Sequence, residues 1–220
     1  MELTTYRWKG FKIRKIKNDD PGIYVETDLI KFIDKIDLKG KNVIDGGSNA
    51  GVFSLYLSRR VGKKGMVYAF EIQGKINNIA KDNACLNNKT NIIFHHQALS
   101  NKSGDKVGFT YIDYYGEKLS SVGVKTEPTL SGQEHCGEVE TITIDDLGIE
   151  NVGLIKLDLE GNEPEAIEGA MNTIINQRPF LIVELSPGYI SDPSQTIEKI
   201  KSHNYSVTQL PDYNYCFEPL

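Results

Sequence analysis

Short apolar runs alternate with amphipathic helical patterns over most of the chain. The apolar runs predict buried strands at residues 43–44, 66–70, 92–94, 154–158 and 180–184. Apolar residues at helical spacing predict helices at residues 27–36, 52–60, 75–87, 163–176 and 194–202. Two last strands are predicted on either side of a Pro-Asp turn, at residues 206–210 and 214–217.

This alternation of strand and helix is typical of βαβ units. It predicts an α/β fold in which a mostly parallel seven-stranded sheet carries helices on both faces. Because a short turn joins the two last strands, we expect the sheet to close with an antiparallel strand at its C-terminal edge.

Two stretches interrupt the alternation. Residues 1–40 form an N-terminal strand and helix extension, in which basic residues between 7 and 17 alternate with apolar ones as in a half-exposed strand. Predicted strands at 107–112 and 139–144 flank a polar, tyrosine-bearing loop. Long loops often bind ligands, so we expect residues 113–137 either to recognise an acceptor or to form a surface connection.

Composition narrows the class of protein. The 220 residues fit one domain, and 39% hydrophobic and 25% charged residues are ordinary for a globular chain. The net charge of −5 makes nucleic acid an unlikely partner. Cysteines 85, 136 and 216 form no Cys-x-x-Cys pair, as expected of reduced thiols. With no apolar leader and no run long enough to span a membrane, we expect a cytoplasmic protein without a membrane partner. The oligomeric state stays open.

A glycine-rich turn follows the first buried strand, where the sequence from residue 42 reads Asn-Val-Ile-Asp-Gly-Gly-Ser-Asn-Ala-Gly-Val-Phe-Ser. It departs from the dinucleotide fingerprint G-x-G-x-x-G, because Asp45 stands at the strand tip, where it would repel a pyrophosphate. The pattern Asp45-x-Gly47-x-Asn49-x-Gly51 resembles the first motif of class I methyltransferases, which bind S-adenosylmethionine. The alternative is a generic glycine-rich turn.

Carboxyl side chains end most of the predicted strands. In an open α/β sheet the ligand lies beyond the carboxyl ends of the strands. Glu71 stands 20 residues after Gly51, where an acid can accept hydrogen bonds from both hydroxyls of an adenosine ribose. His95 and His96 follow the third strand, and we expect one of them to be packed and the other solvated.

A second segment, Ile155-Lys-Leu-Asp-Leu-Glu-Gly-Asn-Glu-Pro-Glu-Ala-Ile-Glu-Gly-Ala170, makes the resemblance specific. A strand that ends in Asp-x-Glu-Gly, an acid-rich helix start, Gly169-Ala170, Arg178-Pro179 and a strand that ends at Glu184 together resemble the FkbM family of S-adenosylmethionine-dependent O-methyltransferases. The resemblance also includes Val67-Tyr-Ala-Phe-Glu71 and Thr143-Ile-Asp-Asp-Leu147, and it extends over about residues 24–190.

The resemblance implies a Rossmann-like class I methyltransferase fold and a set of cofactor-binding residues. Those around the methionine part would be Asp45, Gly46, Gly47, Asn49, Gly51, Val52 and Phe53, together with Asp158. Those around the adenosine part would be Glu71 at the ribose, Ile72 beside the adenine, and Gln97, Ala98 and Leu99 over the base. Tyr24 and Glu26, which stand just before the first helix, would touch the amino-acid end of the cofactor. The family often has Glu-Pro where this chain has Glu71-Ile72, so the contact at Ile72 departs from its pattern.

Asp158, Glu160 and Glu184 are the candidate catalytic residues. Methyl transfer to a hydroxyl requires alignment and removal of a proton, and a carboxylate crowded by others can act as the base. Of the three acids, Asp158 is the first candidate for this base. The same three acids could instead bind one Mg²⁺ ion, although no dedicated metal motif is present.

The resemblance predicts methyl transfer from S-adenosylmethionine to a hydroxyl of a small-molecule or glycan acceptor, with a sugar as the first expectation. A polyketide-like hydroxyl is the second expectation and RNA the third. A module that binds the cofactor without turnover is the alternative of a different class.

Overall fold

A seven-stranded sheet forms the centre of the protein in the computed structural model, which describes residues 3–16, 27–110 and 135–220. Its strands, in spatial order, are β11 (Tyr205–Gln209), β12 (Asn214–Pro219), β10 (Phe180–Glu184), β9 (Val152–Leu157), β3 (Asn42–Gly46), β4 (Val67–Phe70) and β5 (Ile92–His95). The five strands from β10 to β5 are parallel, whereas β12 is antiparallel to both of its neighbours. The predicted sheet is confirmed, with the refinement that β12 lies one position inside the edge formed by β11.

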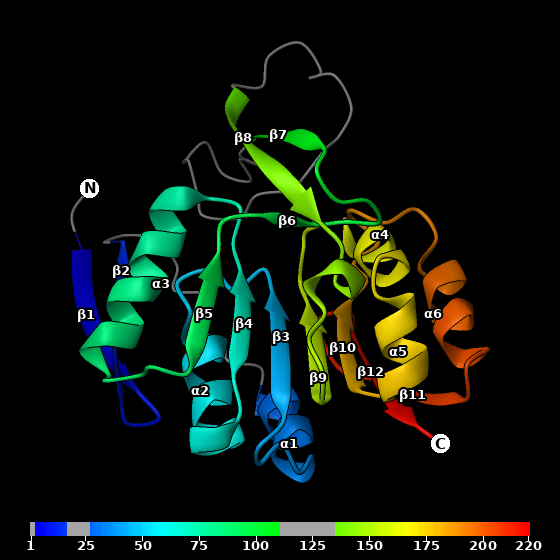
Figure 1. The fold of residues 1–220 in the computed structure, drawn as a ribbon, viewed down its shortest axis with the longest axis horizontal. Helices are drawn as coiled ribbons and strands as arrows, with labels where there is room; N and C mark the ends of the chain where they lie inside the picture. The colour runs from blue at the N-terminus through cyan, green and yellow to red at the C-terminus, as the bar shows by residue number, and fades with distance from the viewer. Residues whose placement is uncertain (1–2, 17–26, 111–134) are drawn as a thin grey trace.

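Helices cover both faces of this sheet. On one face lie α1 (Thr27–Lys35), α2 (Val52–Val61) and α3 (Gly74–Leu86), and on the other lie α4 (Glu163–Glu168), α5 (Met171–Gln177) and α6 (Pro193–Lys201). Each face of the sheet packs against its helices in a separate hydrophobic core, and successive strand residues point to opposite faces. Val43 and Leu154 pack toward α1 and α2, while Ile44 and Ile155 pack toward α4 and α5. Figure 1 shows α4, α5 and α6 in front of the sheet.

The predicted helix at residues 163–176 is wrong as a single element, because it breaks into α4 and α5. The break lies at Gly169 and Ala170, which pack closely under the connection that follows β6 (Ala98–Leu99). A Cβ atom at residue 169 would stand 2.0 Å from the carbonyl oxygen of Ser100. The Gly169 carbonyl also accepts a hydrogen bond of 2.9 Å from the backbone N–H of Asp145, which begins the short 3-10 helix η2 (Asp145–Leu147). Contacts between segments distant in sequence therefore set the break.

Two smaller sheets flank the central one. The N-terminal residues form a hairpin, β1 (Leu3–Trp8) and β2 (Phe11–Ile16), with Phe11 and Ile13 buried against α3 as the alternating pattern predicted. The second small sheet has three strands, in the spatial order β6, β8 (His135–Ile142) and β7 (Lys106–Thr110). Of the loop predicted at residues 113–137, residues 135–137 belong to β8 and the rest lie outside the described residues.

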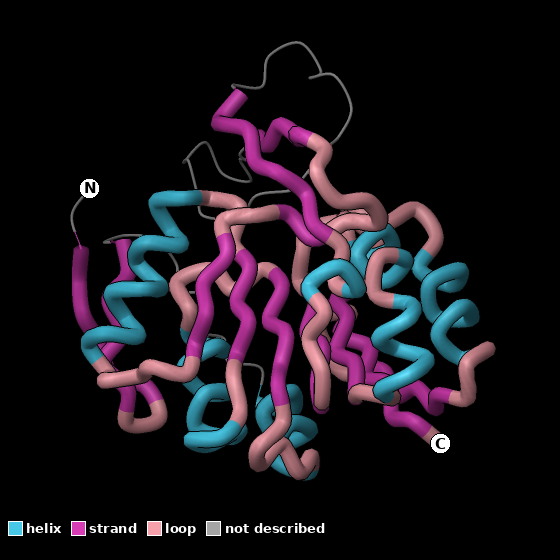
Figure 2. Tube along the Cα trace, in the orientation of Figure 1, coloured by secondary structure: helices cyan, strands magenta, loops and turns pink. Residues whose placement is uncertain are grey.

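The three-stranded sheet lies beyond the carboxyl ends of the central parallel strands (Figure 1). The connections that leave β3, β4, β5 and β9 gather at the same end, as the tube in Figure 2 shows. The remaining short element, the 3-10 helix η1 (Gly62–Lys64), lies at the opposite end, before β4. None of the helices in the described ranges is long and apolar enough to cross a membrane.

Candidate active site

A cavity opens at the carboxyl ends of β3, β4 and β9, under the three-stranded sheet. Its volume is about 630 Å³, which includes the part of its mouth that is open to solvent. The lining residues are Gly47, Asn49, Phe70, Glu71, Ile72, Gln73, Gln97, Ala98, Leu99, Asp158, Leu159, Glu160 and Asn162. Nine of the predicted site residues therefore meet in one place: Gly47, Asn49, Glu71, Ile72, Gln97, Ala98, Leu99, Asp158 and Glu160.

The glycine turn fixes the shape of this cavity. Gly47 has φ of +73°, and a Cβ atom there would stand 1.8 Å from the carbonyl oxygen of Asp158. Gly51 has φ of +78° and lets the start of α2 approach Ala80 of α3. Gly46 serves packing, because its missing side chain makes room for Leu157 and Leu99. The turn after β3 thus lies directly against the backbone that follows β9.

Glu71 at the end of β4 ties the turn to the adjacent strand. One of its oxygens accepts a hydrogen bond of 3.0 Å from the backbone N–H of Asn49, and the other accepts one of 2.8 Å from Gln73. Burial raises the pKa of Glu71 to about 7, although these two hydrogen bonds oppose the rise. Each carboxylate oxygen can accept a second hydrogen bond, so Glu71 keeps acceptor capacity toward the cavity.

A buried lysine that the sequence reading did not single out organises the carboxyl groups beside the cavity. The ammonium of Lys156, whose side chain is 4% exposed, lies 3.2 Å from Oδ2 of Asp158 and 5.2 Å from the ring centroid of Phe53. Burial would raise the pKa of Asp158, but Lys156 and the hydrogen bonds from Glu184 and Lys156 outweigh it and lower this pKa. The sequence signal was a lysine inside the apolar run Leu154–Leu157.

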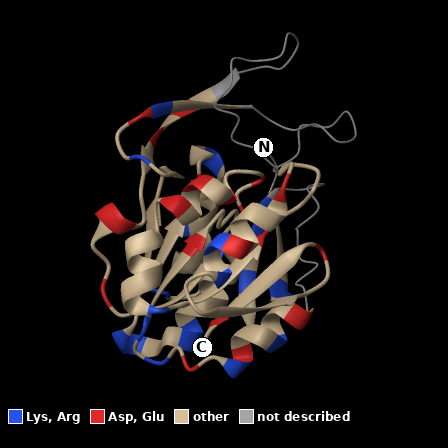
Figure 3. Cartoon of the chain, turned by 90° about the vertical axis from the view of Figure 1, so that its right-hand side faces the viewer, with Lys and Arg blue, Asp and Glu red and all other residues tan. Residues whose placement is uncertain are grey.

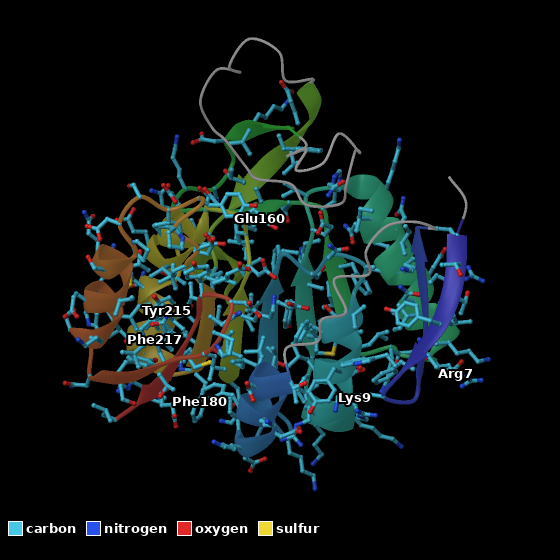
Figure 4. The ribbon with its side chains drawn as sticks, turned by 180° about the vertical axis from the view of Figure 1, so that it is seen from behind. Arg7, Lys9, Glu160, Phe180, Tyr215 and Phe217 are labelled. Carbon is cyan, nitrogen blue, oxygen red and sulfur yellow. The ribbon has the colours of Figure 1, made fainter. Side chains whose placement is uncertain are left out.

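Glu184 and Glu160 have protonation behaviour opposite to that of Asp158. Burial, the charge of Asp158 and the hydrogen bond to Asp158 raise the pKa of Glu184 far above its ordinary value, so Glu184 is protonated at neutral pH and donates to Asp158. Burial and the Asp158 charge also raise the pKa of Glu160, partly offset by a hydrogen bond from the Tyr189 hydroxyl. Glu160 has φ of +55° and lies at the carboxyl end of the sheet (Figure 4).

Two further residues hold the turn after β9 in place, and the sequence reading gave them only a helix-start role. Glu163 accepts hydrogen bonds from the backbone N–H groups of Leu159 and Gly161, and burial raises its pKa to about 7. Asn162 occupies the N-cap position of α4, but its side chain makes no cap hydrogen bond and instead donates a hydrogen bond of 2.6 Å to the carbonyl of Leu99. The spacing Glu160-Gly-Asn-Glu163 was the available signal.

The remaining predicted residues lie outside the cavity wall or outside the described residues. Asp45 is fully buried under the turn, where its Oδ2 accepts a hydrogen bond of 2.5 Å from the Ser54 hydroxyl. Its Oδ1 has no hydrogen-bond partner among the described residues. Burial raises the pKa of Asp45, and Lys156 and Ser54 oppose this rise. Val52 and Phe53 begin α2 and are partly buried in the core. Tyr24 and Glu26 lie outside the described residues.

The donor groups at this site do not support the Mg²⁺ alternative. No three His, Cys, Asp or Glu side chains in the described ranges are placed to hold a metal ion. Asp158 already has a cationic partner in Lys156 and a proton donor in Glu184.

Of the two histidines that follow the third parallel strand, His95 is stacked on Phe70 with 4.4 Å between the ring centroids, and burial lowers its pKa, whereas His96 is exposed. This confirms the expectation of one packed and one solvated histidine.

The strand order, the acid after β4 and the glycine turn define a Rossmann-like class I methyltransferase fold. The sequence matches the family model described as "Methyltransferase FkbM domain" over residues 45–207. Because this match extends over more than half of the chain, the protein belongs to the FkbM methyltransferase family, as the sequence motifs predicted. No curated protein sequence matches it.

Solved structures agree on the fold. A methyltransferase FkbM from Methylobacillus flagellatus is similar with a TM-score of 0.55 and 18% identity, over 80% of this chain and 43% of that one. The chain thus spans less than half of that protein. A SAM-dependent methyltransferase from Aquifex aeolicus is similar with a TM-score of 0.53 and 17% identity, over 91% of this chain and 93% of that one. Aeropyrum pernix fibrillarin, solved with natively bound S-adenosyl-L-methionine, is similar with a TM-score of 0.51 and 11% identity, over 98% of this chain and 81% of that one.

The contact between Gly47 and Asp158 gives a first prediction. We expect Gly47→Ala to destabilise the protein by about 2 kcal/mol or more, because strain at positive φ adds to a clash with a backbone oxygen. Gly104→Ala is the matched control, since Gly104 has φ of +85° but nothing within 4 Å of its would-be Cβ. Urea unfolding measures both variants. Equal losses of stability would show that the close approach to Asp158 is unimportant.

Proposed function

We propose that the protein transfers a methyl group from S-adenosylmethionine to a hydroxyl group of a sugar, in a glycan or a glycosylated metabolite. The observation that carries this proposal is the set of carboxyl groups gathered at the cavity: Asp158 beside the buried Lys156, Glu184 hydrogen-bonded to Asp158, and Glu160 in the lining. Their environments lower the pKa of Asp158 and raise those of Glu184 and Glu160. Carboxyl groups whose environments separate their pKa values are typical of acid–base chemistry. Binding a cofactor alone does not require them.

The cavity and the residues under the turn fit the cofactor. Glu71 has acceptor capacity for ribose hydroxyls, and Ile72, Ala98 and Leu99 provide apolar surface for a base. The orphaned Oδ1 of buried Asp45 fits an ammonium group, because a buried carboxylate oxygen without a partner is costly. When bound, S-adenosylmethionine supplies an electrophilic methyl group on a sulfonium centre.

We assign proton removal to Glu160 rather than to Asp158, the first candidate from the sequence, because Lys156 and the hydrogen bond from Glu184 lower the pKa of Asp158. A general base works best when its pKa lies near the working pH. Glu160 lines the cavity, and burial and the charge of Asp158 raise its pKa from the ordinary value. Asp158, held ionised by Lys156, would orient the acceptor hydroxyl or a cationic part of the cofactor. Glu184 would keep Asp158 in position by donating its proton.

The sugar acceptor rests on the usage of the family and on the polar loop predicted at residues 113–137. Ordinary hydroxyl groups of sugars are weak nucleophiles, so alignment and a base both contribute to the rate. Figure 3 shows Asp and Glu as well as Lys and Arg in the half of the molecule that carries the three-stranded sheet and at the opposite end. The acids in the lining of the first cavity, Asp158 and Glu160 among them, favour a neutral or cationic reacting group there over an anionic one.

Donor use gives a second prediction. We expect S-adenosylmethionine to raise the thermal unfolding midpoint of the protein while NAD leaves it unchanged, because the acid at the tip of β3 repels a pyrophosphate. Transfer of a labelled methyl group to a panel of monosaccharides and small oligosaccharides then identifies the acceptor. Stabilisation by NAD alone would contradict the proposal, and binding of the donor without transfer to any hydroxyl would leave a binding module in its place.

The carboxyl roles give a third prediction. We expect Glu160→Gln to lower kcat by about 10²-fold to 10⁴-fold, because the base is lost. Glu184→Gln should lower it less than about tenfold, since a carboxamide N–H can still donate to Asp158. Single-turnover rates at saturating donor compare the two variants. If Glu184→Gln cost as much as Glu160→Gln, the separate roles assigned to the two acids would be wrong.

The hydrogen bond from Tyr189 gives a fourth prediction. The Tyr189 hydroxyl stabilises the ionised form of Glu160, so its removal in Tyr189→Phe raises the pKa of Glu160. Activity falls as pH falls through the pKa of a base that must be ionised. The acid limb of the kcat profile should therefore move to higher pH in Tyr189→Phe. An unshifted acid limb would show that Glu160 is not the group that titrates.

A further inference from the structure

A second cavity lies between α3 and the three-stranded sheet. Its volume is about 800 Å³, measured in the same way as that of the first cavity. Its lining residues are Gly74, Lys75, Asn77, Asn78, Lys81, His96, Phe109, Gly137 and Glu138. Figure 1 shows the first turn of α3 at the end of the molecule that carries the three-stranded sheet. The family resemblance assigns none of these residues a role.

Positive charge dominates this second cavity. Lys75 and Lys81 flank Asn78 on α3, one turn before it and one turn after it, and both are exposed. Neither lysine has an ion-pair partner among the described residues. The cavity also contains the start of α3, a helix of 13 residues with no side-chain cap, whose first N–H groups carry partial positive charge. Among the described lining residues, Glu138 on β8 is the one acid.

The walls of the second cavity are built around two glycines. A Cβ atom at Gly74 would stand 3.2 Å from the His96 ring, so glycine lets this imidazole lie against the start of α3. Nε2 of His96 lies 2.8 Å from the carbonyl oxygen of Ile72, which fixes the ring. On the opposite wall, the missing side chain of Gly137 accommodates the ring of Phe109.

Asn77 in the same wall has unused hydrogen-bonding groups. Its side chain is 1% exposed, and neither its amide nitrogen nor its carbonyl oxygen has a partner among the described residues. A buried carboxamide without partners costs about 1–3 kcal/mol for each unsatisfied group. Such a cost is characteristic of places where a ligand or an ordered water completes the hydrogen bonds.

We propose that this second cavity, lined by Lys75, Lys81 and His96 at the start of α3, binds a phosphate-type oxyanion. Two lysines, the first turn of a long helix and His96 line one hollow, whose described lining contains a single carboxylate, and oxyanions bind such arrangements. The site depends neither on the cofactor nor on methyl transfer. Its ligand is a phosphate group that is either free or carried by an organic molecule such as an acceptor.

A titration of the ¹⁵N-labelled full chain with inorganic phosphate tests this proposal, at constant ionic strength maintained with chloride. We expect saturable shifts of the backbone amide signals of Gly74, Lys75 and Gly137. Lys75→Ala/Lys81→Ala should weaken the affinity at least tenfold. The control Lys63→Ala/Lys64→Ala removes the same charge from exposed lysines of η1 and should leave the affinity unchanged.

Shifts that do not saturate, or equal weakening by both double variants, would overturn the proposal, because either result describes a general charge effect. Glucose 6-phosphate and glucose distinguish the source of the anion. Tighter binding of glucose 6-phosphate than of inorganic phosphate, with none of glucose, assigns the cavity to an organic phosphate. Equal binding of the two phosphates assigns it to the free ion. The donor-binding assay is a separate readout, so loss of one site is distinguishable from loss of the other.

Discussion

The close approach of Gly47 to the carbonyl of Asp158 is the constraint on which the active end of the molecule depends. It holds the turn after β3 against the turn after β9, and the backbone N–H of Asp158 donates 3.2 Å to the carbonyl of Gly46 at the same place. With these two turns in contact, Glu71 can reach the backbone N–H of Asn49 from the neighbouring strand. Three strand ends thereby become one rigid wall of the cavity.

Lys156 makes a cluster of acids tolerable at this wall. Four carboxyl groups, those of Asp45, Asp158, Glu160 and Glu184, have pKa values that the charge of Lys156 lowers. Without a buried cation, each of these acids would gain protons through burial and mutual repulsion. With it, one acid stays ionised and a neighbour stays protonated, so a single lysine separates the roles of similar groups.

The sequence was sufficient for features that depend on local pattern and insufficient for those that depend on packing. Apolar runs located β3, β4, β9 and β10 closely, because buried parallel strands are continuously apolar. The break at Gly169 was not predictable, since it results from contact with Ser100, which is distant in sequence. The role of Lys156 was missed for a similar reason: a lysine in an apolar run is informative only once its carboxyl partners are known.

The two cavities lie at the same end of the sheet and differ in the charge of their described lining residues, which is acidic in the first and mainly basic in the second. A phosphate beside Asp158, Glu160 and the buried Asp45 would be repelled at short range, where low dielectric makes charge interactions strong. The start of α3 and His96 line the second cavity, and His96 is hydrogen-bonded to the carbonyl of Ile72, which lines the first. An acceptor with both a hydroxyl and a phosphate would therefore place the hydroxyl near the acids and its phosphate toward α3. Charge alone would then orient it before any shape-specific contact is made.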